Sequence, residues 1–208
     1  MLTLNRRAER KASIVAAISK KFGYTTIHDL TAYESQNQFL EGTGSMVFDH
    51  EQQIAFACTS PRTNNEVLLE ACERIGYLPV VFEALDRNKH SIYHTNVMMA
   101  ITGKLAICCF DSIADLADRN GIRNYLKKTG KTIVEITIEQ MESFAGNMLF
   151  ILNKDNQLFV AVSATAWNSL NVSQKTTISA LANEIIVDIP TIEKYGGGGI
   201  RCMLAELF

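Results

Sequence analysis

The chain has 208 residues, of which 47% are hydrophobic, with 20 Lys and Arg residues against 22 Asp and Glu residues. This length and hydrophobic content predict one compact domain with a sizeable core. The near balance of charge excludes the global positive field that favours phosphate backbones or anionic membranes, so we expect neither nucleic acid nor a membrane as a partner.

Signals of export and of metal binding are missing from the sequence. The five cysteines are scattered and lack the CxxC spacing of a zinc site and the density of a disulfide framework. The four histidines also lack paired metal-ligand spacing. The N-terminus turns basic at Arg6, Arg7 and Arg10 without the apolar stretch of a signal peptide. We therefore expect a cytoplasmic protein with reduced cysteines and no metal.

The first elements are a helix and a strand. Apolar residues recur at helical spacing among Arg and Lys over residues 5–22, and Gly23 is a helix stop. Residues 24–30 are rich in β-branched side chains, which predicts a short strand.

Three later segments share one order of elements: an apolar strand, a polar turn, a second apolar strand, a helix and a third strand. Ser45, Val97 and Met148 hold equivalent positions at a spacing of roughly fifty residues, a period that coincidence explains poorly. The β-β-α-β repeats cover about residues 44–84, 95–137 and 146–190, with helices over 64–76, 112–129 and 173–183. Repeats this regular predict a ring or an array.

The two ends of the chain are incomplete copies of the repeat. Residues 5–30 supply only a helix and a strand, and residues 200–207 supply a single closing strand. In a closed ring the last strand must pair with strands near the start, because it otherwise leaves an unpaired edge. We therefore expect a single domain over 1–208 that either is a fragment or closes its sheet differently.

Polar clusters lie at the ends of predicted strands, where the loops of a ring would meet at its axis. Glu41 is followed by Gly42 and Gly44, which allow the backbone to approach a ligand closely while the carboxylate points at it. A glycine turn beside a solvated glutamate is an equal alternative.

A second cluster contains His94 at the start of an apolar strand, with Asn96 two residues later and hence on the same face. Such a pair suits a general acid/base with a hydrogen-bonding neighbour. For a lone histidine, a half-buried residue bonded to the backbone is the commoner alternative. No comparable polar neighbour accompanies the other histidines, His28, His50 and His90, and we expect them to be structural.

The third cluster is the glycine run over residues 196–199, which leads to Arg201 and Cys202. Four consecutive glycines destabilise regular structure, which indicates a loop that passes close to a ligand or another segment. The charge of Arg201 favours the thiolate that performs nucleophilic attack. The alternative is a flexible tail with a buried cysteine, as we expect for Cys108 and Cys109.

The clusters gain weight together because Glu41, His94 and Cys202 occupy equivalent places in different parts of the ring and so converge at its centre. A cysteine nucleophile, a histidine acid/base and a carboxylate make a constellation of the Cys-His type. Asn147 stands at the same place in the third repeat, as either a lining residue or a turn residue.

Five strings carry a resemblance to a known family: LEGTGSMV over 40–47, SPRT over 60–63, YHTNVM over 93–98, AGNML over 145–149 and GGGGIRCM over 196–203. In these strings the chain resembles the guanidino-group modifying enzymes, the pentein superfamily of arginine deiminases, amidinotransferases and dimethylarginine hydrolases. Within it, the chain is most similar to the amidinotransferase-like citrulline utilization hydrolases.

The resemblance implies a pentein-type α/β propeller of β-β-α-β modules, of which this chain is expected to hold three full copies and partial ends and to lack the N-terminal module that family members carry. It implies that Cys202 attacks the guanidino or ureido carbon and forms a covalent thiouronium-like adduct. His94 then protonates the leaving nitrogen and activates water, while Glu41 holds His94 or the substrate nitrogens. This covalent mechanism needs no cofactor.

The resemblance also bears on the substrate. Asn96 stands where deiminases acting on a cationic guanidinium have a second carboxylate, which favours a neutral ureido substrate, citrulline, hydrolysed to ornithine, ammonia and carbon dioxide. Asn147 and Gly42 join Asn96 as predicted substrate-binding residues. Arg62 and Arg201 are candidates to pair with the α-carboxylate of an amino-acid substrate, although exposed arginines are more often solvated.

Three alternatives stay open. An amidinotransferase would pass an amidino group from Cys202 to an amine, and an arginine deiminase would act on the guanidinium. A chain without its N-terminal module would be a catalytically impaired binding module. Retention of Glu41, His94 and Cys202 favours an enzyme. The sequence leaves homo-oligomerisation open.

Overall fold

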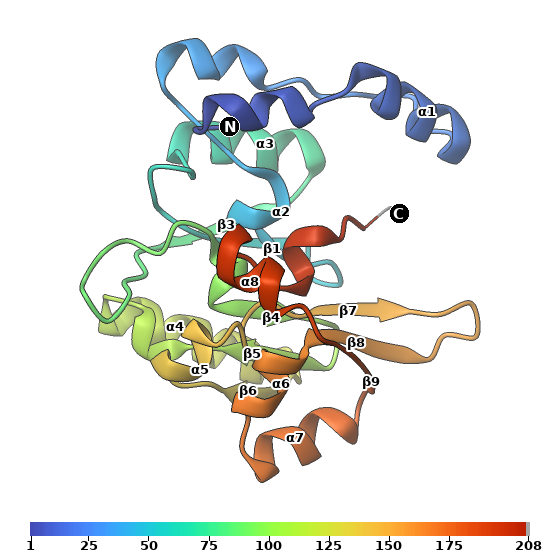
Figure 1. Ribbon diagram of the computed structural model, residues 1–208. Helices are drawn as coiled ribbons and strands as arrows, with labels where there is room; N and C mark the ends of the chain where they lie inside the picture. Colours follow the sequence, from blue (N-terminus) through green and yellow to red (C-terminus); the bar gives the residue numbers. More distant parts are fainter. Residues whose placement is uncertain (207–208) are drawn as a thin grey trace.

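The structure is a computed structural model that describes residues 1–206. Each sequence repeat contains a three-stranded sheet whose first two strands are antiparallel and whose third strand is parallel to the middle one. The strands are β1 Val47–Asp49, β2 Ile54–Cys58 and β3 Leu78–Phe82; β4 Met99–Ile101, β5 Leu105–Cys108 and β6 Thr132–Glu135; and β7 Leu149–Leu152, β8 Leu158–Ser163 and β9 Asn183–Val187. The predicted α/β class is confirmed (Figure 1).

A helix connects the middle strand to the third strand of each sheet, as parallel pairing requires. Caps mark where these helices begin, because Asn64, Asp115 and Asn171 each accept hydrogen bonds from first-turn backbone N–H groups. The crossover helices are α3 Asn65–Ile75, α4 Leu116–Lys128 and α7 Val172–Ser179, and α6 Ala164–Ser169 precedes α7. Shorter elements are α2 Gly42–Ser45, α5 Ile138–Glu142, α8 Pro190–Gly196 and the 3-10 helices η2 Thr31–Gln36, η3 Thr95–Val97 and η4 Phe110–Ser112. Within residues 1–206, no helix has the length and apolar character to cross a membrane.

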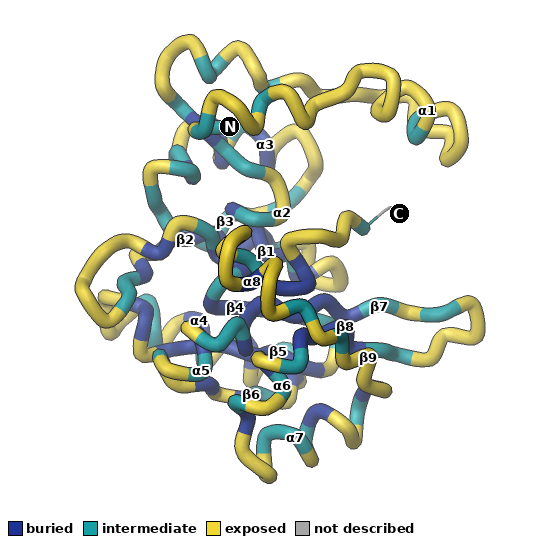
Figure 2. Tube along the Cα trace, in the orientation of Figure 1, coloured by how far each residue is buried: buried dark blue, intermediate teal, exposed yellow. Residues whose placement is uncertain are grey.

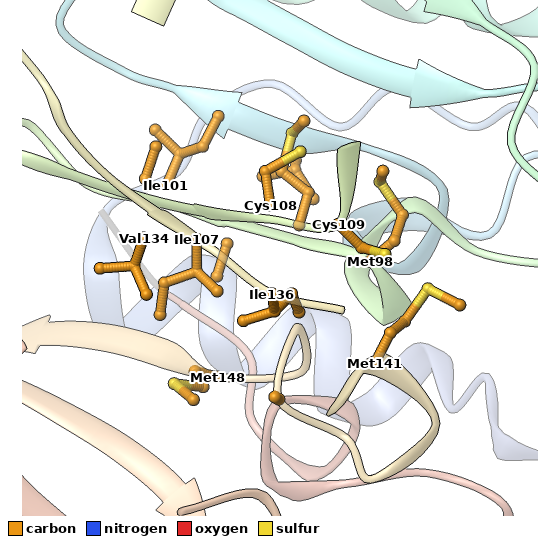
Figure 3. Close-up of a cluster of buried hydrophobic side chains, with 14 of the residues drawn as sticks. Met98, Ile101, Ile107, Cys108, Cys109, Val134, Ile136, Met141 and Met148 are labelled. Atoms are coloured by element: carbon orange, nitrogen blue, oxygen red, sulfur yellow. The ribbon is translucent and has the colours of Figure 1, made fainter. Parts of the chain in front are cut away.

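The main core cluster extends through all three modules. Strand β5 is fully buried along its length, which agrees with a continuous apolar run packed on both faces. Figure 3 shows side chains of this cluster, with Ile107 of β5 beside Val134 of β6 and with Cys108 on the opposite side of the strand. Figure 2 shows buried positions concentrated along the sheets, whereas residues 1–30 are mostly exposed.

Successive modules meet through their first strands, since β1 lies beside β4 and β4 lies beside β7. A buried ion pair adds a second link between the first two modules. Lys131 Nζ lies 2.9 Å from Asp49 Oδ2, and neither side chain is exposed by more than 1%. The hydroxyl of Tyr125 donates to the same carboxylate oxygen at 3.0 Å. These contacts fix the end of β1 against α4 and β6.

The prediction for residues 5–30 is wrong in part. The helix is divided into the 3-10 helix η1 Leu4–Glu9 and α1 Ala12–Phe22, because Arg10 and Lys11 have extended backbones. Residues 24–30 form no strand. Composition favoured a strand, but a strand also needs a neighbouring backbone to pair with, and this segment has none in the described part of the chain. In Figure 1, α1 extends away from the sheets.

The predicted closing strand over residues 200–207 is also wrong. Ile200–Met203 form the 3-10 helix η5, and the amide of Leu204 donates to the carbonyl of Arg201 instead of to a strand. Residue 207 lies outside the described residues. Gly197, at a φ of 68°, ends α8 in the left-handed conformation, and the 3-10 helix η5 that follows lies beside β8.

The burial of β5 gives a testable prediction for stability. Leu105→Ala should lower the free energy of unfolding by about 2–5 kcal/mol, because Leu105 is 0% exposed and its removal leaves a cavity in the core. Leu152→Ala is the matched control in strand β7, since Leu152 is 64% exposed, and it should cost less than about 0.5 kcal/mol. Urea unfolding followed by circular dichroism measures both, and equal losses would contradict the assigned core.

Candidate active site

A cavity of about 460 Å³ lies between segments of the first two modules and the C-terminal segment. The three predicted catalytic residues all line it, so residues 53 and 108 positions apart in sequence come together in space. The lining residues are Met1, Arg6, Glu41, Thr43, Gly44, Arg62, Tyr93, His94, Asn96, Gly196, Gly197, Gly198, Arg201, Cys202 and Leu204. The described chain holds no group of three or more His, Cys, Asp or Glu side chains that is arranged to bind a metal.

Glu41 and His94 form a direct pair, with Nε2 of His94 2.9 Å from Oε2 of Glu41. The buried hydroxyl of Thr95 donates to the carbonyl of Ser45 at 2.6 Å, which ties the histidine segment to helix α2. Gly44 makes the approach possible, because a Cβ atom there would lie 2.8 Å from Nδ1 of His94. The histidine ring thus requires a glycine at position 44, three residues after Glu41.

The carboxylate of Glu41 is almost fully enclosed, with its side chain 7% exposed. Burial alone would raise its pKa, but the hydrogen bonds from His94 and from the Leu2 amide outweigh it, and the charges of His94 and Arg62 add to them. The result is a pKa of about 2. Glu41 is therefore ionised at neutral pH and oriented by three partners.

Cys202 lies in η5 at the edge of the cavity and is exposed. The other four cysteines of the chain are buried. Burial raises the pKa of each of them, to about 11 for Cys58. Cys108 and Cys109 are thus core residues, as predicted, and Cys202 is the thiol that solvent and small molecules reach.

Two buried polar side chains of the cavity have an atom without a hydrogen-bond partner among the described residues. Asn96 is 3% exposed and its Oδ1 is unpartnered, and Arg201 is 7% exposed and its Nε is unpartnered. Burial lowers the pKa of Arg201, while the charges of Glu206 and Cys202 act in the opposite direction. Both side chains have hydrogen-bonding capacity left for a bound molecule.

Arg62 and Tyr93 complete one wall of the cavity. The guanidinium of Arg62 lies 5.2 Å from the ring centroid of Tyr93, and its Nη1 is 3.4 Å from Oε2 of Glu41. The hydroxyl of Tyr93 donates to the carbonyl of Gly197 at 2.9 Å and so ties the second module to the glycine run.

Two residues of the predicted substrate-binding set do not line this cavity. Gly42 has a φ of 56° and lines a neighbouring cavity instead. Asn147 is buried, and its side-chain amide contacts Cys202 and the backbone of Asn96. Sequence reasoning missed Arg6, which lines the cavity from the N-terminal segment and which the sequence shows only as one of three arginines in a basic N-terminus.

The fold of repeated α/β modules is that of the pentein superfamily of guanidino-modifying proteins. The family model described as "N,N dimethylarginine dimethylhydrolase, eukaryotic" matches residues 1–208, and the chain belongs to this family. The resemblance to the superfamily stated from the sequence is confirmed. No curated protein matches the chain.

Solved structures share the fold. The apo structure of ArgZ, an arginine dihydrolase from cyanobacteria, is 17% identical with a TM-score of 0.72, covering 97% of this chain and 29% of that one. A dimethylarginine dimethylhydrolase, DDAH from Pseudomonas aeruginosa, in complex with citrulline, is 16% identical with a TM-score of 0.61, covering 95% and 65%. The amidinotransferase SxtG from Microseira wollei is 13% identical with a TM-score of 0.52, covering 76% and 42%. The chain thus spans less than two thirds of each of these proteins.

The difference in burial among the cysteines predicts selective alkylation. Iodoacetamide should modify Cys202 first, because the other four thiols are buried and burial raises their pKa values. Peptide mapping by mass spectrometry after a short exposure measures the site, and Cys202→Ser should remove the early product. Equal modification of all five cysteines in the folded protein would contradict the described burial.

The lowered pKa of Glu41 predicts a pH-dependent contribution to stability. A carboxyl group with a depressed pKa stabilises the fold above its unfolded pKa and loses that effect as pH falls towards its folded pKa. The difference in unfolding free energy between the wild type and Glu41→Gln should therefore be full above about pH 5.5. It should shrink as pH falls from 4.5 towards 2.

Urea unfolding over a pH series tests this effect of Glu41. Glu73→Gln is the matched control, because it removes an exposed carboxylate of α3 that lies outside the cavity. A pH-dependent difference of equal size in the control would assign the effect to general charge and not to the pair with His94.

Proposed function

We propose that this protein is a cysteine-dependent hydrolase that acts on the ureido or guanidino carbon of an amino acid. The observation that carries the proposal is the gathering of Cys202, His94 and Glu41 on one cavity. An exposed thiol, an imidazole and a carboxylate that is ionised at neutral pH are the groups that covalent acyl-type or amidino-type transfer needs.

In the first step the thiolate of Cys202 attacks the central carbon of the substrate, and a carbon–sulfur bond forms. The bond from that carbon to the leaving nitrogen breaks as His94 gives this nitrogen a proton. Glu41 stabilises the protonated imidazole through its 2.9 Å bond to Nε2. Because Nε2 is held in this way, we assign the proton exchange to Nδ1.

In the second step a water molecule gives a proton to His94 and attacks the carbon of the covalent adduct. The carbon–sulfur bond breaks, and Cys202 returns to its thiolate form. From citrulline, the first step releases ornithine and the second releases carbamate, which decomposes to ammonia and carbon dioxide.

Citrulline is the substrate that the cavity supports best. The unpartnered Oδ1 of Asn96 is an acceptor suited to a ureido N–H group. Among the described lining residues, Glu41 supplies the single carboxylate. This carboxylate already forms hydrogen bonds with His94 and Arg62. A cationic guanidinium would find little uncompensated negative charge, whereas Arg62 and Arg201 suit the α-carboxylate of an amino acid.

A guanidinium substrate is the second candidate, and the family description favours it, because that description names dimethylarginine hydrolysis. The same thiol would then form a thiouronium adduct and release an amine or ammonia. Transfer of the amidino group to an amine in place of water would be the amidinotransferase variant of this chemistry.

The test is to incubate the protein separately with L-citrulline, L-arginine and N,N-dimethylarginine and to quantify ornithine, citrulline and dimethylamine. We expect ornithine from citrulline, and a loss of at least about 10³-fold in Cys202→Ser and in His94→Ala. An arginine-plus-glycine mixture tests transfer to an amine. Turnover of arginine or dimethylarginine without turnover of citrulline would show that the substrate is a guanidinium compound and not citrulline. Turnover that persists in Cys202→Ser would overturn the mechanism.

A further inference from the structure

We propose that Asn147 is a positioning residue that donates a hydrogen bond to the sulfur of Cys202 and holds the thiolate ready for attack. The proposal deepens the proposed function and rests on Cys202 as the nucleophile. It differs from the prediction that Asn147 binds substrate, because the side chain contacts the sulfur of Cys202 and does not line the cavity.

The orientation of the Asn147 amide follows from its other partner. Nδ2 lies 2.9 Å from the backbone carbonyl oxygen of Asn96. A carbonyl oxygen only accepts, so the nitrogen and not the oxygen of the amide must face it. One N–H of Nδ2 is used there, and the second lies toward Sγ of Cys202 at 3.3 Å.

The same amide suits both protonation states of the thiol. A neutral thiol can donate to Oδ1 of Asn147, which lies 3.5 Å from Sγ. A thiolate cannot donate, but it accepts from Nδ2, and a hydrogen bond to a charged acceptor is stronger than one between neutral groups. Asn147 therefore favours the ionised sulfur.

The amide is held rigidly by backbone packing on both sides. Asn147 is 3% exposed, and its backbone N–H donates to the carbonyl of Phe144 at 2.8 Å. A Cβ atom at Gly146 would lie 2.3 Å from the carbonyl oxygen of Val97, and one at Gly199 would lie 2.8 Å from Oδ1 of Asn147. This packing orients the donor before the thiolate forms, so little reorganisation accompanies the reaction.

Other charged and titratable groups line the same cavity as Cys202, and they are unchanged in variants of Asn147. They are Arg6 from the N-terminal segment, Glu41 and Arg62 from the first module, Tyr93 and His94 from the second, and Arg201 from η5 itself. A change seen on substitution of Asn147 alone is thus assignable to its amide.

The test measures the rate of Cys202 alkylation by iodoacetamide as a function of pH, which needs no substrate and no turnover. Asn147→Ala should shift the midpoint of this profile to higher pH and slow alkylation at neutral pH by about tenfold. Asn147→Asp, which keeps the size of the side chain, should shift it further, because a carboxylate opposes the thiolate. Asn88→Asp adds the same charge on an exposed loop and should leave the profile unchanged.

The outcomes separate a positioning role from the alternatives. An unchanged profile in a folded Asn147→Asp protein, with folding checked by circular dichroism, overturns the proposal. A raised KM with an unchanged alkylation profile assigns Asn147 to substrate binding instead. A shifted profile in a protein that turns over none of the tested substrates supports the positioning role and rejects only the proposed function.

Discussion

The site depends on three backbone approaches that leave no room for a Cβ atom. Gly44 lies against the imidazole of His94, Gly146 against the carbonyl of Val97, and Gly199 against the amide of Asn147. Each contact joins two segments that are distant in sequence, and each would place a Cβ atom within 2.8 Å of its neighbour. The glycines therefore set how closely the modules approach one another, and that distance decides whether the thiol, the imidazole and the carboxylate share one cavity.

The repeated sheets were predictable because each is specified locally. Apolar runs, polar turns and helix caps recur inside every repeat, and parallel pairing of the third strand follows from the connecting helix. The strands predicted at residues 24–30 and 200–207 depended on partners outside their own segments. Composition says nothing of whether a partner exists, so these two predictions were wrong.

Part of the site was predictable for the same reason. Equivalent places in repeats converge, and this argument, together with the family resemblance, indicated that Glu41, His94 and Cys202 meet. The contacts that tune these residues are not periodic. The amide of Leu2 donates to Glu41 at 2.8 Å across 39 residues, and the amide of Asn147 reaches Cys202 across 55 residues. Such pairs are visible only once the chain is folded.

The charges that line the cavity favour one kind of substrate over another, and the segment after the glycine run supplies one of these charges. Arg6, Arg62 and Arg201 line the cavity with the single carboxylate of Glu41 among the described lining residues, so positive charge exceeds negative charge there. An amino acid with a free α-carboxylate and a neutral side-chain end complements this balance better than one with a cationic end. The turn at Gly197, held by the hydroxyl of Tyr93, brings Arg201 and Cys202 to the same wall. The segment that presents the thiol therefore also presents a guanidinium suited to the α-carboxylate of the proposed citrulline substrate.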